Sequence, residues 1–397
     1  MNAAPSNDPV CITGLGMATA LGCDAPNACA AARAGLLRLR ELKVLNFQAD
    51  QIWGGGPVKG HTVPLGAEGS LGVAKALTLG RLALADLMSR LPLGRAELAR
   101  TALHLNLADQ FLTDAHEVAV RAEAKQLVAA KSSIAGGEPV EVDENAPLPS
   151  ARWAEQCKDF IPRLLRRCGL EGSPASSSVS FGGHTGVVPT LQKAVDDLRR
   201  LDRCLVGGID CCVEPAFLTA AVAAGLLKTD ENPVGFLPGE AAAFFMLEKL
   251  AAARARGAKV LAVLGPSASS REKCDRLSDT LPQGIALTGV IREVLAGQAR
   301  NGQRLGLVVG DLNGDVARGM EWGHALPRLH PEFRLGDLSL WLAAQSFGET
   351  GAAAGPLAVC LAAQALQRGY APSPAVLIWL ASDNGSRAAL SVEAAPA

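Results

Sequence analysis

The sequence predicts an α/β protein in which helices cover parallel sheets. The chain has 397 residues and 49% hydrophobic content, which is ample for a large buried core. Its 42 glycines and low aromatic content of 4% suit helices packed closely on a sheet with short turns. Short β-branched runs alternate with Ala- and Leu-rich helical patterns along most of the chain, and this alternation favours parallel sheets covered on both faces.

In the first part of the chain, short apolar runs predict five strands, at residues 9–14, 102–108, 176–181, 204–209 and 242–248. Apolar residues at helical spacing predict helices at residues 27–37, 69–91, 152–170 and about 186–199. Residues of about 131–150 are rich in Ser, Gly, Pro and acids without periodicity, which predicts an exposed loop insertion.

After Arg256-Gly257 the pattern of strands and helices begins again. It predicts strands at residues 260–264, 305–309, 376–380 and 388–392, and helices at 289–296 and 352–366. This restart predicts two similar halves, an N-terminal one of residues 1–257 and a C-terminal one of residues 258–397.

Composition excludes several classes of function. With 38 basic and 39 acidic residues, the chain is not shaped as a whole to attract nucleic acid or an anionic membrane. We find no secretory pattern and no apolar run long enough to cross a bilayer, so we expect a cytoplasmic protein. The ten cysteines form no C-x-x-C pair and no zinc spacing, and we therefore expect no metal and no cofactor.

Three stretches resemble the β-ketoacyl synthase family. Val10-Cys11-Ile12-Thr13-Gly14-Leu15-Gly16-Met17 is similar to its opening strand and turn, and Cys204-Leu205-Val206-Gly207-Gly208-Ile209-Asp210 to the strand after its nucleophile helix. The most specific stretch is Gly235-Phe236-Leu237-Pro238-Gly239-Glu240, which leads into an apolar strand and an Arg256-Gly257-Ala258 turn. The three occur in the family's order and at roughly its spacing.

This resemblance implies the thiolase fold, in which two similar βαβαβαββ halves form a five-layered α-β-α-β-α core. It also implies a chemistry. In the family, a cysteine at the start of a buried helix accepts an acyl group, and two histidines assist decarboxylation and carbon–carbon bond formation.

The positions that carry this chemistry hold other residues here. The family's nucleophile lies ten residues before an alanine that matches Ala194, which puts His184 at that position. Asn313 matches the first catalytic histidine and Glu349 the second. The family's lysine five residues earlier falls on Ala344, and its closing loop is replaced by Ser382-Asp383-Asn384-Gly385-Ser386. An acyl-imidazole hydrolyses readily, so His184 is a poor acyl carrier.

Two hypotheses describe the altered site. If His184, Asn313 and Glu349 lie together, a His–carboxylate pair could act as general base while Asn313 holds a carbonyl. Alternatively, His184 hydrogen-bonds Glu349 and the pair fills the old cavity without chemistry. We favour the second hypothesis, which leaves no assigned catalytic residue.

The resemblance therefore suggests a catalytically degenerate binding partner or adaptor, such as an accessory of a type VI secretion effector. The alternatives are a chain-length-factor-type partner of an active ketosynthase, or an acyltransferase-like enzyme acting on acyl groups or acyl carrier protein through His184 and Glu349. The predicted partners are accordingly an effector, a ketosynthase or an acyl carrier protein. Since the family pairs the strand before the nucleophile across a two-fold axis, we expect a homodimer through residues 176–181.

Overall fold

The computed structural model describes residues 8–42, 58–64, 69–135, 145–300, 305–333 and 338–396. Within these ranges, ten strands form one sheet in the order β10-β9-β11-β12-β8-β1-β7-β6-β4-β5. Their bounds are β1 Val10–Ala18, β4 Thr101–Leu107, β5 Ser176–Phe181, β6 Arg203–Cys211, β7 Glu240–Lys249, β8 Ala262–Arg271, β9 Leu305–Gly310, β10 Ser339–Leu342, β11 Ala375–Ala381 and β12 Ser386–Glu393. The short strands β2 (Arg40–Glu41) and β3 (Lys59–Gly60) form a separate pair.

The sheet consists of two five-stranded parts with the same arrangement. In the first part, β1–β7 and β7–β6 pair antiparallel, while β6–β4 and β4–β5 pair parallel. In the second part, β8–β12 and β12–β11 pair antiparallel, while β11–β9 and β9–β10 pair parallel. The two parts meet where Cys11 and Ile12 of β1 pair with Val263 and Ala262 of β8. This repeat confirms the two similar halves. The predicted boundary at 257/258 stays a prediction; it falls between α10 (Leu250–Ala255) and β8.

The prediction of parallel sheets holds only in part, because each part of the sheet has two parallel and two antiparallel pairings. A strand that is buried on both faces has a continuous apolar sequence whether its neighbours run parallel or antiparallel. All but the last residue of β7 are buried, for example, although both neighbours of β7 run antiparallel to it.

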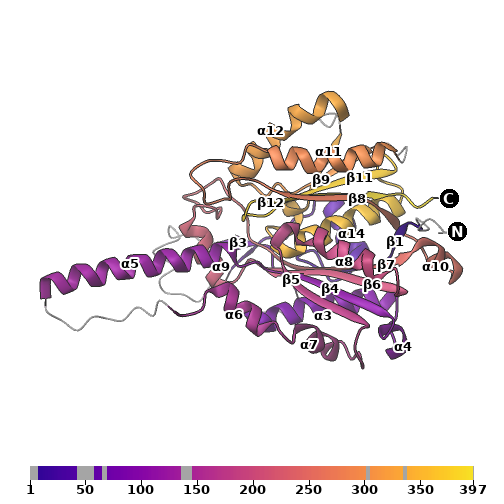
Figure 1. Cartoon of the computed structure of the whole chain (residues 1–397), viewed down its shortest axis with the longest axis horizontal. Helices are drawn as coiled ribbons and strands as arrows, with labels where there is room; N and C mark the ends of the chain where they lie inside the picture. The colour runs from indigo at the N-terminus through magenta and orange to yellow at the C-terminus, as the bar shows by residue number, and fades with distance from the viewer. Residues whose placement is uncertain are drawn as a thin grey trace, which may run out of the picture.

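Helices form three layers around the two parts of the sheet (Figure 1). Helix α3 (Gly72–Arg90) covers β1, β7 and β6, and α11 (Ile285–Arg300) covers β8 and β12. Between the two parts lie α8 (Val187–Asp197) and α14 (Ala354–Gln367), each in contact with strands of both. Other helices are α1 Ala25–Arg33, α4 Arg95–Leu98, α6 Pro149–Gln156, α7 Phe160–Arg167, α9 Pro215–Ala223, α12 Val316–Phe333 and α13 Ala343–Phe347. The predicted five-layered α-β-α-β-α core is thus confirmed.

The central helix α14 is apolar on all sides because it is enclosed. Twelve of its fourteen residues are buried, as expected for a helix without a polar face. A Cβ on Gly355 would lie 2.5 Å from Cγ1 of Val187, so glycine allows α14 and α8 to pack this closely. Burial of each Leu or Val side chain along α14 contributes about 1.5–3 kcal/mol. The two central helices therefore hold the two parts of the sheet at a fixed separation.

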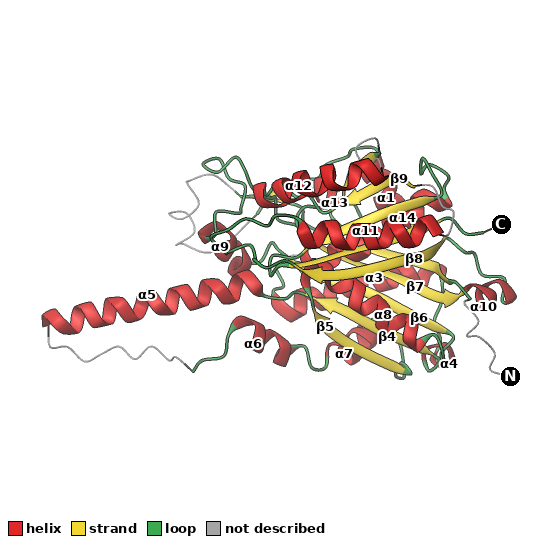
Figure 2. Ribbon diagram, turned by 45° about the horizontal axis from the view of Figure 1, so that its top comes forward, coloured by secondary structure: helices red, strands yellow, loops and turns green. Residues whose placement is uncertain are grey.

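Helix α5 (Phe111–Ala135) extends away from the body of the molecule (Figure 2). The predicted loop insertion at about 131–150 was wrong at both ends, because residues 131–135 belong to α5 and α6 begins at Pro149. The part of that prediction that covers residues 136–144 lies outside the described residues. Lys is a good helix former and Ser an intermediate one, and α5 continues through residues 131–133.

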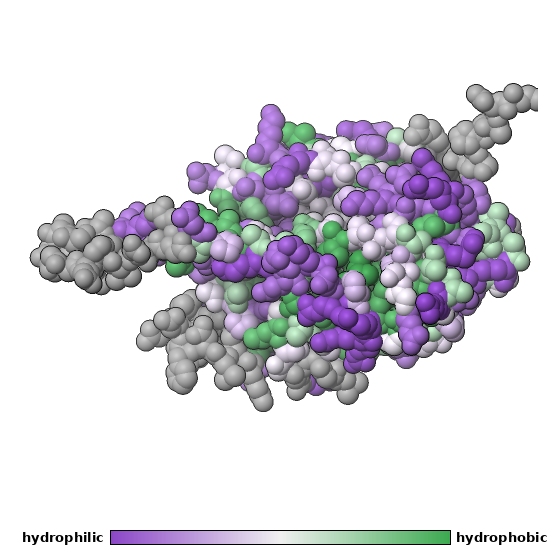
Figure 3. Space-filling model, turned by 60° about the horizontal axis from the view of Figure 1, so that its bottom comes forward, coloured by the Kyte–Doolittle hydropathy of each residue, from purple (hydrophilic) through white to green (hydrophobic). Residues whose placement is uncertain are grey.

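On the face shown in Figure 3, hydrophilic and hydrophobic residues are interspersed, and several hydrophobic ones lie near the middle. None of the helices in the described ranges has the length and hydropathy that a bilayer crossing requires.

Candidate functional site

His184 lies at a sharp turn between the edge strand β5 and the central helix α8. Strand β5 ends at Phe181, and Gly183 adopts a φ of 54°, a left-handed conformation that favours glycine. A Cβ at Gly183 would also lie 2.5 Å from Oδ2 of Asp109. The short helix η1 (Gly183–Gly186) then leads into α8 and leaves His184 buried, with 6% of its surface exposed. The turn thus delivers this side chain into the interior between the two halves.

Both ring nitrogens of His184 contact carboxylates. Nδ1 lies 2.8 Å from Oδ2 of Asp311, and Nε2 lies 2.6 Å from Oε1 of Glu349. Burial lowers the pKa of the imidazole, but the charges of Asp311 and Glu349 outweigh burial and raise the pKa to about 10. At neutral pH the ring is therefore an imidazolium that donates both of its N–H groups.

Arg318 is a second buried cation in the same cluster. Its Nη1 lies 3.4 Å from Oε2 of Glu349, and its Nη2 donates to Oδ1 of Asp383 at 3.1 Å. The guanidinium lies 3.3 Å from Nε2 of His184, a repulsive contact between two cations that the shared carboxylates offset. Burial raises the pKa of Glu349, but His184 and Arg318 outweigh it and hold that pKa well below its usual range. The cluster is thus a set of mutually neutralised buried charges.

The structure brings the three predicted positions together. Asn313 Nδ2 donates to Oε2 of Glu349 at 2.5 Å, while Oε1 of the same carboxylate faces His184. The hydrogen bond between His184 and Glu349 is present, as the second hypothesis for the altered site expects.

Sequence reasoning missed Asp311 and Arg318. Asp311 stands two residues before Asn313, at the end of β9, and its Oδ2 also accepts from the backbone N–H of Ala381. Arg318 lies in the first turn of α12, a helix that the sequence pattern did not predict. For Asp311 the available signal was position, because residues directly after a strand that ends beside a buried site commonly line that site.

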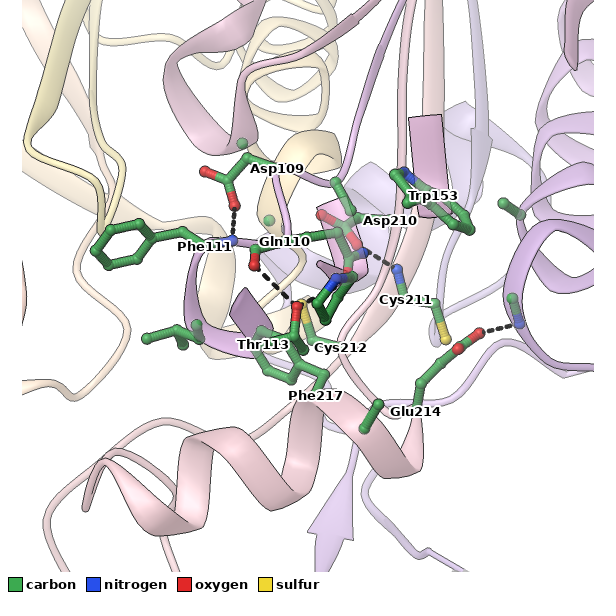
Figure 4. A pocket seen from close by; sticks show the side chains of 18 of the residues that line it. Asp109, Gln110, Phe111, Thr113, Trp153, Asp210, Cys211, Cys212, Glu214 and Phe217 are labelled. Atoms are coloured by element: carbon green, nitrogen blue, oxygen red, sulfur yellow. Dashed lines mark hydrogen bonds between the residues drawn. The ribbon is translucent and has the colours of Figure 1, made fainter. Parts of the chain in front are cut away.

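A pocket of about 240 Å³ opens beside His184. Its walls come from α3, the β4–α5 connection, α6, and the segment from the end of β6 into α9, as the close view in Figure 4 shows in part. Asp210 lines it and accepts from the backbone N–H groups of Cys211 (2.7 Å) and Ala352 (2.8 Å). Burial raises the pKa of Asp210 to about 7, while these two N–H groups lower it.

Two thiols also line the pocket, but neither has the character of a nucleophile. Burial raises the pKa of Cys211 and of Cys212 well above the ordinary value. The Cys211 thiol donates to Oε2 of Glu240 at 3.3 Å. In the residues that the structure describes, no group of three His, Cys, Asp or Glu side chains converges as a metal site requires.

Comparisons with known proteins agree with this architecture. No family model matches the chain. Erythronolide synthase EryA3 of Saccharopolyspora erythraea is 32% identical over 229 residues, a match that covers 53% of this chain and only 7% of that much longer synthase. A type II polyketide ketosynthase solved with its acyl-carrier protein, AntDE:AntF, superposes with a TM-score of 0.73 at 17% identity. The superposition covers 98% of this chain and 100% of the ketosynthase chain. The ishigamide ketosynthase/chain length factor superposes with a TM-score of 0.70 at 18% identity and the same coverage.

The chain therefore has the same fold as these ketosynthases, as its resemblance predicted.

Proposed function

We propose that the protein is a ketosynthase-fold subunit that binds a protein partner and does not itself condense acyl groups. One observation carries the proposal. At the start of α8, where the family resemblance places the nucleophile, His184 has a carboxylate oxygen 2.8 Å from Nδ1 and another 2.6 Å from Nε2, and these two anions favour a proton on each nitrogen. A group that is protonated at both nitrogens has no lone pair with which to attack a thioester.

The same observation disfavours the alternative of an enzyme that uses His184 and Glu349. A general base must accept a proton near neutral pH, and His184 already holds both of its protons there. Glu349 accepts from His184, Asn313 and the backbone N–H of Gly351, and its lowered pKa makes it a weak base. Neither member of the pair suits proton abstraction.

The relatives suggest the class of partner. One solved relative is a ketosynthase with its acyl-carrier protein, and another pairs a ketosynthase with a chain length factor. We accordingly propose a ketosynthase or an acyl carrier protein as the partner of this chain. The role as a secretion-effector accessory and the cytoplasmic location stay predictions.

Self-association through β5 also stays a prediction, and the sheet order supports it. Strand β5 is the last strand of the order and pairs, among the described strands, only with β4. Ala175 donates its backbone N–H to Thr101 at the start of β4. Because the N–H groups of successive residues in a strand point to opposite sides, that of Ser177 also faces β4, while those of Ser176 and Ser178 face the open edge. A partner strand can therefore pair with this edge.

The partner is identified by affinity capture of the tagged full-length chain from its native host, followed by mass spectrometry of the co-purified proteins. Recovery of a ketosynthase or acyl carrier protein, abolished by competition with the untagged chain, supports the proposal. His184→Gln/Glu349→Gln should still capture the same partner. Formation of a β-ketoacyl product from acyl and malonyl carrier proteins by the wild-type chain, lost in that double variant, would refute it.

The dimer prediction has its own test in light scattering. Ser176→Pro removes an N–H at the open edge of β5 without removing a bond to β4, and it should lower the mass from that of a dimer to that of a monomer. Ser177→Ala, at an exposed position on the same strand, is the matched control and should leave the mass unchanged. A wild-type mass of one chain would contradict the dimer.

A further inference from the structure

The pocket beside His184 has an unusual excess of carboxyl groups. Asp109 and Asp210 face it from the ends of neighbouring strands (Figure 4), and Glu214, Glu349 and Asp383 line it as well. Asp109 accepts from the backbone N–H of Phe111 at 3.1 Å and from Asn384 Nδ2 at 3.4 Å. Within the described ranges, no lysine or arginine forms an ion pair with Asp109 or Asp210.

The cations near the inner wall are already engaged. His184 is bound by Asp311 and Glu349, and Arg318 by Glu349 and Asp383. Arg152 lines the pocket too, but it is exposed and donates to the carbonyl of Pro147. The His184 imidazolium lies close enough to act on Asp109 and Asp210, but its two N–H groups are taken by Asp311 and Glu349, which leaves carboxyl groups in excess at this wall.

Burial of these carboxyl groups has a measurable consequence. Burial raises the pKa of Asp109, and it raises that of Asp210 to about 7. Asp210 faces Asp109, His184 and the two pocket thiols, and Glu349 and Asp383 lie in the same pocket. The two carboxyl groups together therefore favour a shared proton, and a bound cation can replace that proton.

The rest of the pocket suits an organic cation better than a metal ion. Phe111, Trp153 and Phe217 line it, and aromatic faces attract ammonium groups. No metal-ligand cluster forms among the described side chains, and the volume of about 240 Å³ is far larger than a bare ion needs.

We propose that this pocket binds a primary ammonium group on a short apolar chain, with the nitrogen between Asp109 and Asp210 and the chain against the aromatic side chains. The inference concerns a ligand of the isolated chain and does not depend on the proposed protein partner. The ammonium group has two sources, a free small amine or a lysine side chain presented by another protein.

Isothermal titration of the full-length protein with three probes of equal chain length tests the charge preference. The probes are n-pentylamine, 1-pentanol and pentanoate. At pH 8 we expect the amine to bind at least tenfold more tightly than the alcohol, and pentanoate not to bind. At pH 6 the amine should bind about tenfold more weakly, because protonation of Asp210 removes one anion. Equal binding of amine and pentanoate, or tighter binding of the amine at pH 6, overturns the proposal.

Substitutions locate the site. Asp109→Asn and Asp210→Asn should each weaken binding of n-pentylamine tenfold or more. Asp196→Asn, an exposed acid on α8 outside the pocket lining, is the matched control and should leave binding unchanged. Thermal unfolding shows whether each variant is folded, and Asp109→Asn serves if Asp210→Asn is not. Unchanged binding in a folded pocket variant overturns the proposal.

A second ligand separates the two sources. Nα-acetyl-lysine methylamide carries the ammonium on a peptide-like backbone. Binding as tight as that of n-pentylamine supports a lysine side chain from another protein, whereas binding of the free amine alone supports a small metabolite. If neither amine binds, the pocket is not an ammonium site.

Discussion

Replacing Glu349 by glutamine removes the charge on which the buried cluster depends while keeping the size of the side chain. Glu349 is 4% exposed and receives hydrogen bonds from His184 Nε2 (2.6 Å), Asn313 Nδ2 (2.5 Å) and the Gly351 N–H (2.9 Å). Without its charge, the His184 imidazolium keeps only Asp311, and Arg318 loses one of its carboxylates. Breaking a buried ion pair by removing one partner costs about 3–5 kcal/mol.

The expected shift in the thermal midpoint follows from the size of the chain. Unfolding entropy is about 2.1 cal/mol/K per residue, or about 0.8 kcal/mol/K for 397 residues, so a loss of about 4 kcal/mol lowers the midpoint by about 5 °C. Differential scanning fluorimetry measures it. The matched control is Glu332→Gln, which breaks the pair of Glu332 with Arg292 at 3.2 Å, where both side chains are about half exposed. Equal midpoints for the two variants would show that the buried cluster does not stabilise the fold.

Two further predictions concern the same turn and cluster. The pKa of His184 rises from 6.5 to about 10 on folding, so its contribution is complete below pH 6.5 and is lost as the pH rises towards 10. Urea titrations should therefore show the wild-type free energy of unfolding falling across this range more steeply than that of His184→Gln, and parallel curves would contradict the assignment. Gly183→Ala should destabilise the protein by about 1–3 kcal/mol because of the positive φ and the contact with Asp109. Gly289→Ala, inside α11 where nothing meets a new Cβ, should stabilise it by up to about 1 kcal/mol, and the same effect from both would refute the strain at Gly183.

The sequence predicted nine of the ten strands of the described sheet, all but β10, because they are short, strongly patterned segments. The family resemblance aligned His184, Asn313 and Glu349 with the positions of one site, and their meeting in space was left open. The sequence did not predict α12, since Pro327 and Pro331 lie within that helix and weaken its pattern. That omission hid Arg318, whose burial no local rule predicts. An arginine is buried only where tertiary structure supplies anions, and here Asp311, Glu349 and Asp383 come from three separate segments.

The sequence did not predict the pocket, for a related reason. Asp109 follows β4 and Asp210 lies in the last two residues of β6, strands that pair in the sheet although the two residues are about a hundred positions apart in the chain. Each looks like an ordinary polar residue at the end of a strand. Only the parallel pairing of β4 with β6 places both carboxyl groups beside the start of α8.

The charges around position 184 also decide whether a cysteine there would be reactive, and His184→Cys tests this. A thiolate at this position would replace a cation by an anion facing Asp311, Glu349 and Asp109, with Arg318 as the remaining cation of the cluster. Since burial and nearby carboxylates both disfavour a thiolate, we expect the introduced thiol to have a pKa above the usual value of about 8.5, despite its place at a helix start. The pH dependence of iodoacetamide labelling, read by mass spectrometry of the peptide that contains position 184, measures it against the buried native thiols such as Cys212. Labelling at pH 7 faster than that of a free thiol would show that the site still activates a nucleophile. In that case the loss of a nucleophile would depend on the residue at position 184 alone, because its neighbours would still lower the pKa of a thiol there.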